Sequence, residues 1–126
     1  MYDTELVRDI LSQILGAAET VRQRFDSVKN ADFFTNSPQG MEKLDAICMQ
    51  LIAIGESLKS LDKITNGTLL AEYPEIDWRG AKGMRDIISH HYFDIDAEAI
   101  YDVCANKLGP LAQAIAKMIK NIDKNR

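Results

Sequence analysis

The sequence predicts an all-α fold, a bundle of four to five helices that run up and down. Apolar residues recur three and four positions apart over most of the 126 residues, which is the spacing of one helix face. Glycine, proline and asparagine mark a few short connections, and the alternating pattern of β-strands is almost absent. Amphipathic helices joined by short connections are typical of antiparallel bundles.

The first helix is expected over residues 4–28, followed by a break at residues 29–38. Its apolar positions alternate four and three apart: Val7, Leu11, Ile14, Ala18, Val21, Phe25 and Val28. Ser37 and Pro38 then have the residue types of an N-cap and a first helical turn. The same period continues in the second helix at Leu44, Ile47, Cys48, Leu51, Gly55, Leu58 and Leu61. These two seams are expected to form the core or a homodimer face.

A third long helix is expected to begin at Asp77, a residue type that caps helices. The connection before it, marked by Asn66-Gly67 and Pro74, has room for a short helical turn at residues 69–72. On a helical wheel one apolar arc holds Ala81, Met84, Ile87, Ile88 and His91. The opposite face holds Arg79, Lys82, Asp86, Ser89 and His90, with Arg85 and Tyr92 at its border.

Asp96 is expected to cap the last helix. Its apolar stripe holds Ile100, Val103, Cys104, Leu108, Leu111, Ile115, Met118 and Ile122. Pro110 lies inside this stripe, and because proline lacks an N–H and collides with the preceding turn, the helix should kink or split there. No boundary divides the chain, so a single domain over residues 1–126 is expected.

The composition is that of an ordinary soluble protein, with 46% hydrophobic and 27% charged residues. The net charge of −4 argues against a general nucleic-acid coat protein, because nonspecific affinity comes mainly from cations that meet phosphates. There is no apolar run of about 18 residues and no signal-peptide pattern, so a cytoplasmic location away from membranes is expected. Cys48 and Cys104 then correspond to buried free thiols. The spacings typical of metal ligands do not occur, so neither a metal nor a cofactor is expected.

The stretch 77–96 contains both histidines and the only tryptophan. Asp86 and His90 are four apart, so on one helix the carboxylate could orient the imidazole and favour its protonated form. Without other signals, such a surface pair is more often structural than functional. Arg85 and His90 are five apart, about 140° around the helix, so a single helix does not bring them together. A second copy of the helix facing the first would do so.

Arg85, Asp86, His90 and Tyr92 also form the pattern R-x4-H-x-Y, with a polar residue directly after the arginine. This pattern resembles the HEPN superfamily of helical RNA-cleaving domains, and it is most similar to HEPN toxins paired with a minimal nucleotidyltransferase antitoxin. Residues 46–61 and the flanks 74–78 and 92–96 resemble the corresponding parts of that family. His91 stands where the family usually has a small residue, so the shifted register R-x5-H stays open.

The resemblance implies a metal-independent endoribonuclease toxin that works as a homodimer and cleaves RNA by attack of the 2′-hydroxyl. His90 would transfer protons, Arg85 would bind the phosphate and Asp86 would hold His90. Arg79 and Lys82 would add RNA-binding cations. The resemblance further implies that a cognate nucleotidyltransferase antitoxin transfers AMP to Tyr92, which would block the site by bulk and charge.

Two other readings remain open. The chain could be a non-catalytic HEPN subunit that binds nucleotide or substrate for a partner nucleotidyltransferase. It could also be a plain helical interaction module in which His90 has no role. If the chain is a nuclease, the helical wheel and the spacing to Tyr92 both favour His90 over His91 as the active histidine. The alternative is that the helix ends near Ser89, in which case the wheel does not apply to either histidine.

Overall fold

A computed structural model describes residues 2–90 and 92–125 of the chain, and of Tyr92 it describes the backbone alone. All regular structure within these residues is helical, which confirms the predicted all-α class. The elements in order are α1 (Thr4–Phe25), η1 (Ala31–Phe34), α2 (Pro38–Ile64), α3 (Thr68–Ala71), α4 (Trp78–His90), η2 (Tyr92–Asp94), α5 (Ala97–Asp102), η3 (Val103–Lys107) and α6 (Leu108–Lys124).

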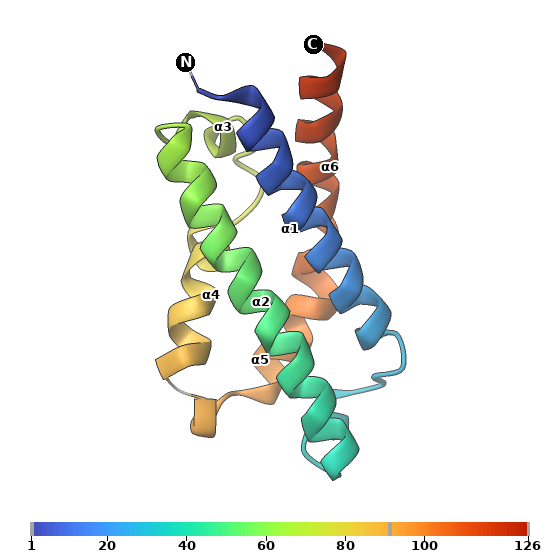
Figure 1. Cartoon of the computed structure of the whole chain (residues 1–126). Coiled ribbons are helices and arrows are strands. Elements are labelled where there is room, and N and C mark those ends of the chain that lie inside the picture. Colours follow the sequence, from blue (N-terminus) through green and yellow to red (C-terminus); the bar gives the residue numbers. More distant parts are fainter. Residues whose placement is uncertain (1, 91, 126) are drawn as a thin grey trace.

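The long helices form an up-and-down bundle with α2 at its centre (Figure 1). α2 packs against α1 on one side and against α4 on the other, and α6 packs against α1. α1 begins and α6 ends at the same end of the bundle, whereas α4 ends toward the opposite end (Figure 1). The predicted bundle is therefore confirmed, and α4 is attached mainly through α2.

Helix starts follow the predicted capping residues, because each cap satisfies a backbone N–H that the first turn leaves without a partner. Ser37 Oγ accepts a hydrogen bond from the N–H of Gly40 at 3.0 Å, and Asp77 Oδ1 accepts one from Gly80 at 3.0 Å. Asp96 Oδ1 accepts from the N–H groups of residues 98 and 99. The end of α1 was predicted less well, since the helix stops at Phe25 while Val28 is buried in the following loop.

Pro110 splits the last helical region, as predicted. α5 and α6 are joined by η3, a π-helical turn in which the N–H of Leu108 bonds to the carbonyl of Val103, five residues earlier. A wider turn just before Pro110 gives its ring room that a regular α-turn would not provide.

The core is built from the predicted seams. The buried seam residues of α1 are Val7, Leu11, Ile14, Ala18 and Val21. In α2 every residue of the predicted seam is buried. Cys48 and Cys104 are buried free thiols, and burial raises the pKa of each to about 12. Within the described residues, no helix has both the length and the apolar character needed to cross a membrane.

Candidate functional site

The motif helix α4 has one side in the core. Trp78 and Ile88 are buried there, and the indole Nε1 of Trp78 donates a 2.9 Å hydrogen bond to the carbonyl of Tyr73. This bond fixes the start of α4 against the loop that leads into it. The sides of α4 on which Arg85, Asp86 and His90 lie follow from which side of the helix is buried.

Ile87 corrects the predicted apolar arc. It was expected to face the core with Ile88, yet it is 56% exposed. The buried residues centre on the direction shared by Ala81 and Ile88, and Ile87 lies about 120° from Ala81 around the axis. An isoleucine at the edge of a predicted arc is therefore in solvent.

A second side of α4 meets α2 through a ladder of ion pairs. Lys82 Nζ lies 2.8 Å from Asp62 Oδ2, and Lys59 Nζ lies 3.4 Å from Asp86 Oδ2. Further along, Arg85 Nε lies 2.9 Å from Glu56 Oε1. The α2 partners, Glu56, Lys59 and Asp62, are three residues apart, a spacing that places them on neighbouring turns of one helix.

The two helix backbones approach closely at Gly55, beside this ladder. A Cβ atom at Gly55 would lie 3.1 Å from the carbonyl oxygen of Ala81 and 3.4 Å from the backbone nitrogen of Arg85. Only a residue without a side chain allows this contact without a shift of α4. Gly55 therefore sets how near the arginine of the motif lies to α2.

Asp86 has partners that the sequence did not predict. Its expected partner was His90, but Asp86 Oδ1 instead lies 3.1 Å from Arg85 Nη1, and Oδ2 contacts Lys59. The hydrogen bond from Arg85, followed by the hydrogen bond and charge of Lys59, lowers the pKa of Asp86. Both partners are permanent cations, and their charge-assisted hydrogen bonds to the carboxylate account for the position of Asp86.

His90 is the last residue of α4 and is exposed. Its side of the helix points away from α2 and the core, and it carries four uncharged or histidine residues three and four apart: Gly80, Gly83, Ile87 and His90. We call these four residues the outer stripe. A Cβ atom at Gly83 would meet nothing within 4 Å, so space is open beside the stripe.

The remaining predicted site residues are spread along α4. Lys82 is paired with Asp62, whereas Arg79 is exposed and lies about 16 Å from His90 along the helix axis. Arg85 and Asp86 touch each other, but His90 has no described contact with either of them. The prediction that one helix does not bring Arg85 and His90 together is consistent with this placement. His91 and the side chain of Tyr92 lie outside the described part of the chain.

Reasoning from the sequence missed the ionic roles of Glu56 and Lys59, which contact the motif from α2. Charges of alternating sign three residues apart at positions 56, 59 and 62 were the available signal. Such a pattern is also typical of a solvated helix face. Which helix it would meet depends on packing between segments that are distant in the sequence.

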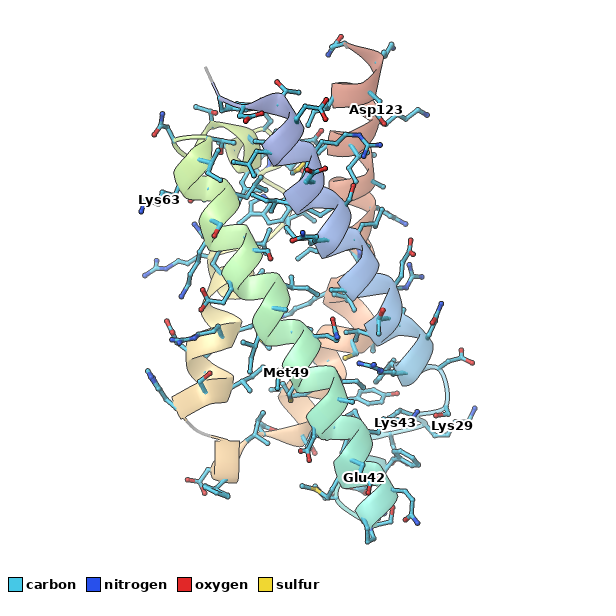
Figure 2. All side chains as sticks on the ribbon, viewed as in Figure 1. Lys29, Glu42, Lys43, Met49, Lys63 and Asp123 are labelled. Atoms are coloured by element: carbon cyan, nitrogen blue, oxygen red, sulfur yellow. The ribbon has the colours of Figure 1, made fainter. Side chains whose placement is uncertain are left out.

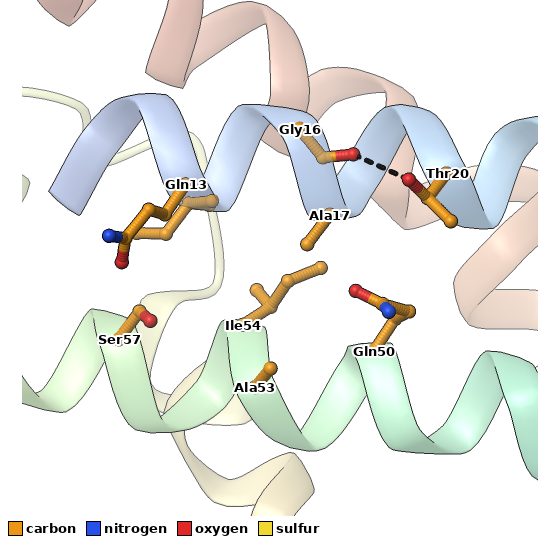
Figure 3. Close-up of a pocket in the computed structure, with 9 residues that line it drawn as sticks. Gln13, Gly16, Ala17, Thr20, Gln50, Ala53, Ile54 and Ser57 are labelled. Atoms are coloured by element: carbon orange, nitrogen blue, oxygen red, sulfur yellow. Dashed lines mark hydrogen bonds between the residues drawn. The ribbon is translucent and has the colours of Figure 1, made fainter. Parts of the chain in front are cut away.

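Two grooves on the surface lie apart from the motif. One, of about 290 Å³, runs between α1 and α2 and is lined by Gln13, Ile14, Gly16, Ala17, Thr20, Gln50, Ala53, Ile54 and Ser57, none of which is charged (Figure 3). The other, of about 320 Å³, is lined by residues of the N-terminal segment, α3 and α6 with their flanks. Among the described residues, no three His, Cys, Asp or Glu side chains gather as a group that could hold a metal. Neither groove is lined by a described residue of the motif.

Comparison with known proteins identifies relatives over much of the chain. It is 35% identical over 78 residues to "Putative RNase MJ0127" of Methanocaldococcus jannaschii, a match that spans 62% of this chain and 61% of that protein. It is 28% identical over 120 residues to "Gamma-glutamylcyclotransferase and putative RNase MJ0434" of the same organism, spanning 95% of this chain and 50% of that protein. The chain thus spans between half and two thirds of the length of these two relatives. No solved structure matches it significantly.

A third relative matches nearly end to end: "Putative RNase MJ1216" of the same organism is 25% identical over 118 residues, which is 92% of each chain. The family model described as "Ribonuclease HepT-like" matches residues 5–118, from the start of α1 to the last third of α6. That match includes the whole of α2 and α4 and therefore the ladder, the outer stripe and the motif. The chain belongs to the HepT-like ribonuclease family.

Proposed function

We propose that the chain is a metal-independent endoribonuclease that acts as a homodimer, with the α4 helices of two copies facing each other. The observation that carries this proposal is the outer stripe, which ends in His90 and has the spacing of a helix-packing seam. Gly83, where an added Cβ would meet nothing within 4 Å, allows a second helix to approach closely, and Ile87, exposed in one chain, would be covered. A two-fold axis beside the stripe would bring two histidines and two arginines to one groove.

Such a groove has the groups that RNA cleavage needs. RNA supplies its own nucleophile, the 2′-hydroxyl beside each phosphodiester. His90 would accept or donate the proton, since imidazole titrates near neutral pH. Arg85 would bind the phosphate and stabilise the charge that develops on it. The relatives named as RNases support this substrate, and Arg79 and Lys82 would contribute cations along the path of the RNA.

Cleavage of a labelled RNA by purified protein tests the proposal. We expect cleavage to continue in excess chelator and to stop when a single 2′-deoxy sugar stands at the scissile position. His90→Ala should abolish cleavage with an unchanged thermal midpoint, whereas His91→Ala should keep most activity. Activity that returns only with added magnesium would contradict the metal-independent part. The reverse result for the two histidines would select the register R-x5-H.

The dimer can be tested at Gly83. Replacing it with leucine adds a side chain where the single chain has open space, and leucine favours helix over glycine by roughly 0.5–1 kcal/mol. We therefore expect Gly83→Leu to fold at least as stably as the native chain, to scatter light as a monomer and to lose cleavage. Gly16→Leu, at an exposed position that lines the groove between α1 and α2 away from α4, is the matched control and should remain an active dimer. A fully active Gly83→Leu protein would contradict the proposed interface.

The family also supports a regulated toxin. A cognate minimal nucleotidyltransferase would transfer AMP to Tyr92, two residues after His90, and the added phosphate would repel RNA. Incubation with such an enzyme and ATP should add one AMP mass to the wild-type protein and stop cleavage. Tyr92→Phe should remain unmodified under the same conditions.

One observation favours a second candidate, a non-catalytic HEPN subunit of a nucleotidyltransferase. Arg85 is paired with Glu56 and Asp86, as an arginine with a structural role would be. Under this alternative the protein would bind the nucleotidyltransferase tightly but never cut RNA, even at high concentration. RNA cleavage that depends on His90 excludes it.

A further inference from the structure

Arg85 is held from two helices. Its Nε atom lies 2.9 Å from Glu56 Oε1 on α2, and its Nη1 atom lies 3.1 Å from Asp86 Oδ1 on its own helix. An ion pair at Nε and a hydrogen bond at Nη1 hold the guanidinium group from two directions. Asp86 alone, adjacent in sequence and attached to the same helix, would leave that plane free to turn.

The contact with Glu56 is supported by the backbone. A Cβ atom added at Gly55, the residue before Glu56, would lie only 3.4 Å from the backbone nitrogen of Arg85, so the two main chains are close at this point. The main chain of Arg85 and its guanidinium are thus both fixed relative to the same turn of α2. The carbonyl oxygen of Lys82 would lie equally close to that Cβ atom, but the side chain of Lys82 pairs with Asp62, about two turns later on α2.

Arg85 retains donors for an anion. A guanidinium has five N–H groups; the described hydrogen bond to Asp86 uses one on Nη1, and Nε is in ion-pair contact with Glu56. One N–H on Nη1 and both on Nη2 remain, which is enough for a phosphate that binds two oxygens side by side. The side chains of Arg85 and Glu56 are 43% and 51% exposed, so their pairing contributes little to folding.

We propose that Glu56 is a positioning residue for RNA cleavage: it holds Nε of Arg85 so that Nη1 and Nη2 are presented to the scissile phosphate. This inference rests on the function proposed above. Holding the arginine in place before RNA binds removes an ordering cost from the chemical step. The carboxylate of Glu56 also repels RNA phosphates, so positioning should come at some cost in affinity.

These two effects predict opposite changes in kcat and KM for Glu56→Gln. The amide has the same shape but lacks the charge, so the arginine is held less firmly and the phosphate is repelled less. We expect kcat to fall about tenfold, within the range that small misplacements produce. KM should stay constant or decrease. Glu56→Asp, which keeps the charge on a shorter side chain, should recover part of kcat.

Asp123→Asn provides a matched control. Asp123 pairs with Arg8 Nε at 2.6 Å, another exposed arginine–carboxylate contact, at the end of the bundle remote from the end of α4 (Figure 2). Its loss should leave kcat unchanged. Thermal midpoints of all three variants should stay close to that of the native chain. The Nε–H resonance of Arg85, assigned by NMR, should exchange faster with solvent in Glu56→Gln than in Asp123→Asn.

The possible outcomes separate the two proposals. Native protein that never cleaves RNA overturns the proposed function, and the role of Glu56 with it. Native protein that cleaves, with a kcat in Glu56→Gln within twofold of the native value, overturns the role of Glu56 alone. Equal losses in Glu56→Gln and Asp123→Asn would also overturn it. A raised KM at constant kcat would do the same, because Glu56 would then act in binding.

Discussion

The two flanks of α2 differ in how they bind their neighbouring helices. Toward α1 the contact is mainly apolar, with Ile14 and Ile54 buried beneath a groove that has no charged lining residue (Figure 3). Near the end of α1, Arg24 and Lys43 add hydrogen bonds to backbone carbonyls across this contact. Toward α4 the backbones meet at Gly55, and charged side chains pair along the edge of the contact. Met49, exposed on the outward surface of α2, lies between these flanks (Figure 2).

The stability of the bundle and the placement of the charged side chains of α4 therefore depend on different flanks of α2. A buried isoleucine or leucine contributes roughly 1.5–3 kcal/mol, whereas an exposed ion pair contributes about 0–1 kcal/mol. The ladder therefore adds little to the free energy of unfolding, although it determines where Arg85 and Lys82 point. Helix α4 can therefore carry Arg85, the residue proposed to bind phosphate, without the ladder having to stabilise the bundle.

The largest effect should come from breaking the apolar flank. Ile14→Ala removes a side chain that is 1% exposed, and the cavity should lower the free energy of unfolding by about 2–5 kcal/mol. Urea denaturation measures this loss. The neighbouring exposed residue offers a control, since Gln13→Ala should change stability by less than about 0.5 kcal/mol. Equal effects at the two positions would contradict the contrast between core and groove.

A smaller effect is expected from pushing the charged flank apart. In Gly55→Ala the new Cβ would be 3.1 Å from the carbonyl oxygen of Ala81, closer than ordinary contact, so α4 must shift. We expect a loss of about 1–3 kcal/mol from overpacking, together with reduced RNA cleavage. Gly16→Ala, where the added Cβ meets nothing within 4 Å, should instead raise stability by roughly 0.5–1 kcal/mol. A Gly55→Ala protein as stable and active as native would show that the close contact has no consequence.

Most of the fold was predictable because it follows from local patterns. The seams of α1 and α2, the caps at Ser37 and Asp77 and the break near Pro110 all depend on residues close in the sequence. The end of α1 was not predictable in this way. Val28 continues the apolar period, but it is buried from a loop.

The positions of the motif residues on α4 were predictable, but their contacts were not. The helix, the exposed His90 and the half-buried Arg85 followed from a wheel drawn on α4 alone. The partners of Asp86 did not, because Lys59 is 27 residues away and reaches it only through the packing of α2 on α4. Ile87 was assigned to the core by its hydrophobicity, and the wheel alone does not fix where an apolar arc ends.

Raising the pH should destabilise the folded chain through the two buried thiols of the core. The pKa of about 12 for Cys48 and Cys104 exceeds the usual value of 9.0, because burial disfavours the thiolate. Above pH 9 the unfolded chain releases thiol protons that the folded chain keeps. The protonated thiols thus make their full contribution to the free energy of unfolding below pH 9, and this contribution is lost as the pH rises toward 12. Between pH 9 and 10 we expect a loss of about 1 kcal/mol per thiol.

Unfolding in urea at pH 8, 9 and 10 measures this slope. The native chain should lose more stability over that range than the variant with both Cys48→Ala and Cys104→Ala, in which lysines and tyrosines still titrate. Identical slopes would show that the thiols are accessible to solvent in the folded chain.

The smallest expected effect on stability is the interaction energy between Asp62 and Lys82, one ion pair of the ladder. Asp62 and Lys82 approach to 2.8 Å and their side chains are each 28% exposed, the least exposed pair among the described salt bridges. A double-mutant cycle with Asp62→Asn and Lys82→Met should give a coupling of about 0–1 kcal/mol. Raising the salt concentration to about 1 M should reduce it, since the screening length is then about 3 Å. A coupling of several kcal/mol that persists in salt would mean that the charged flank also stabilises the bundle, and that placement and stability are not separated along α2.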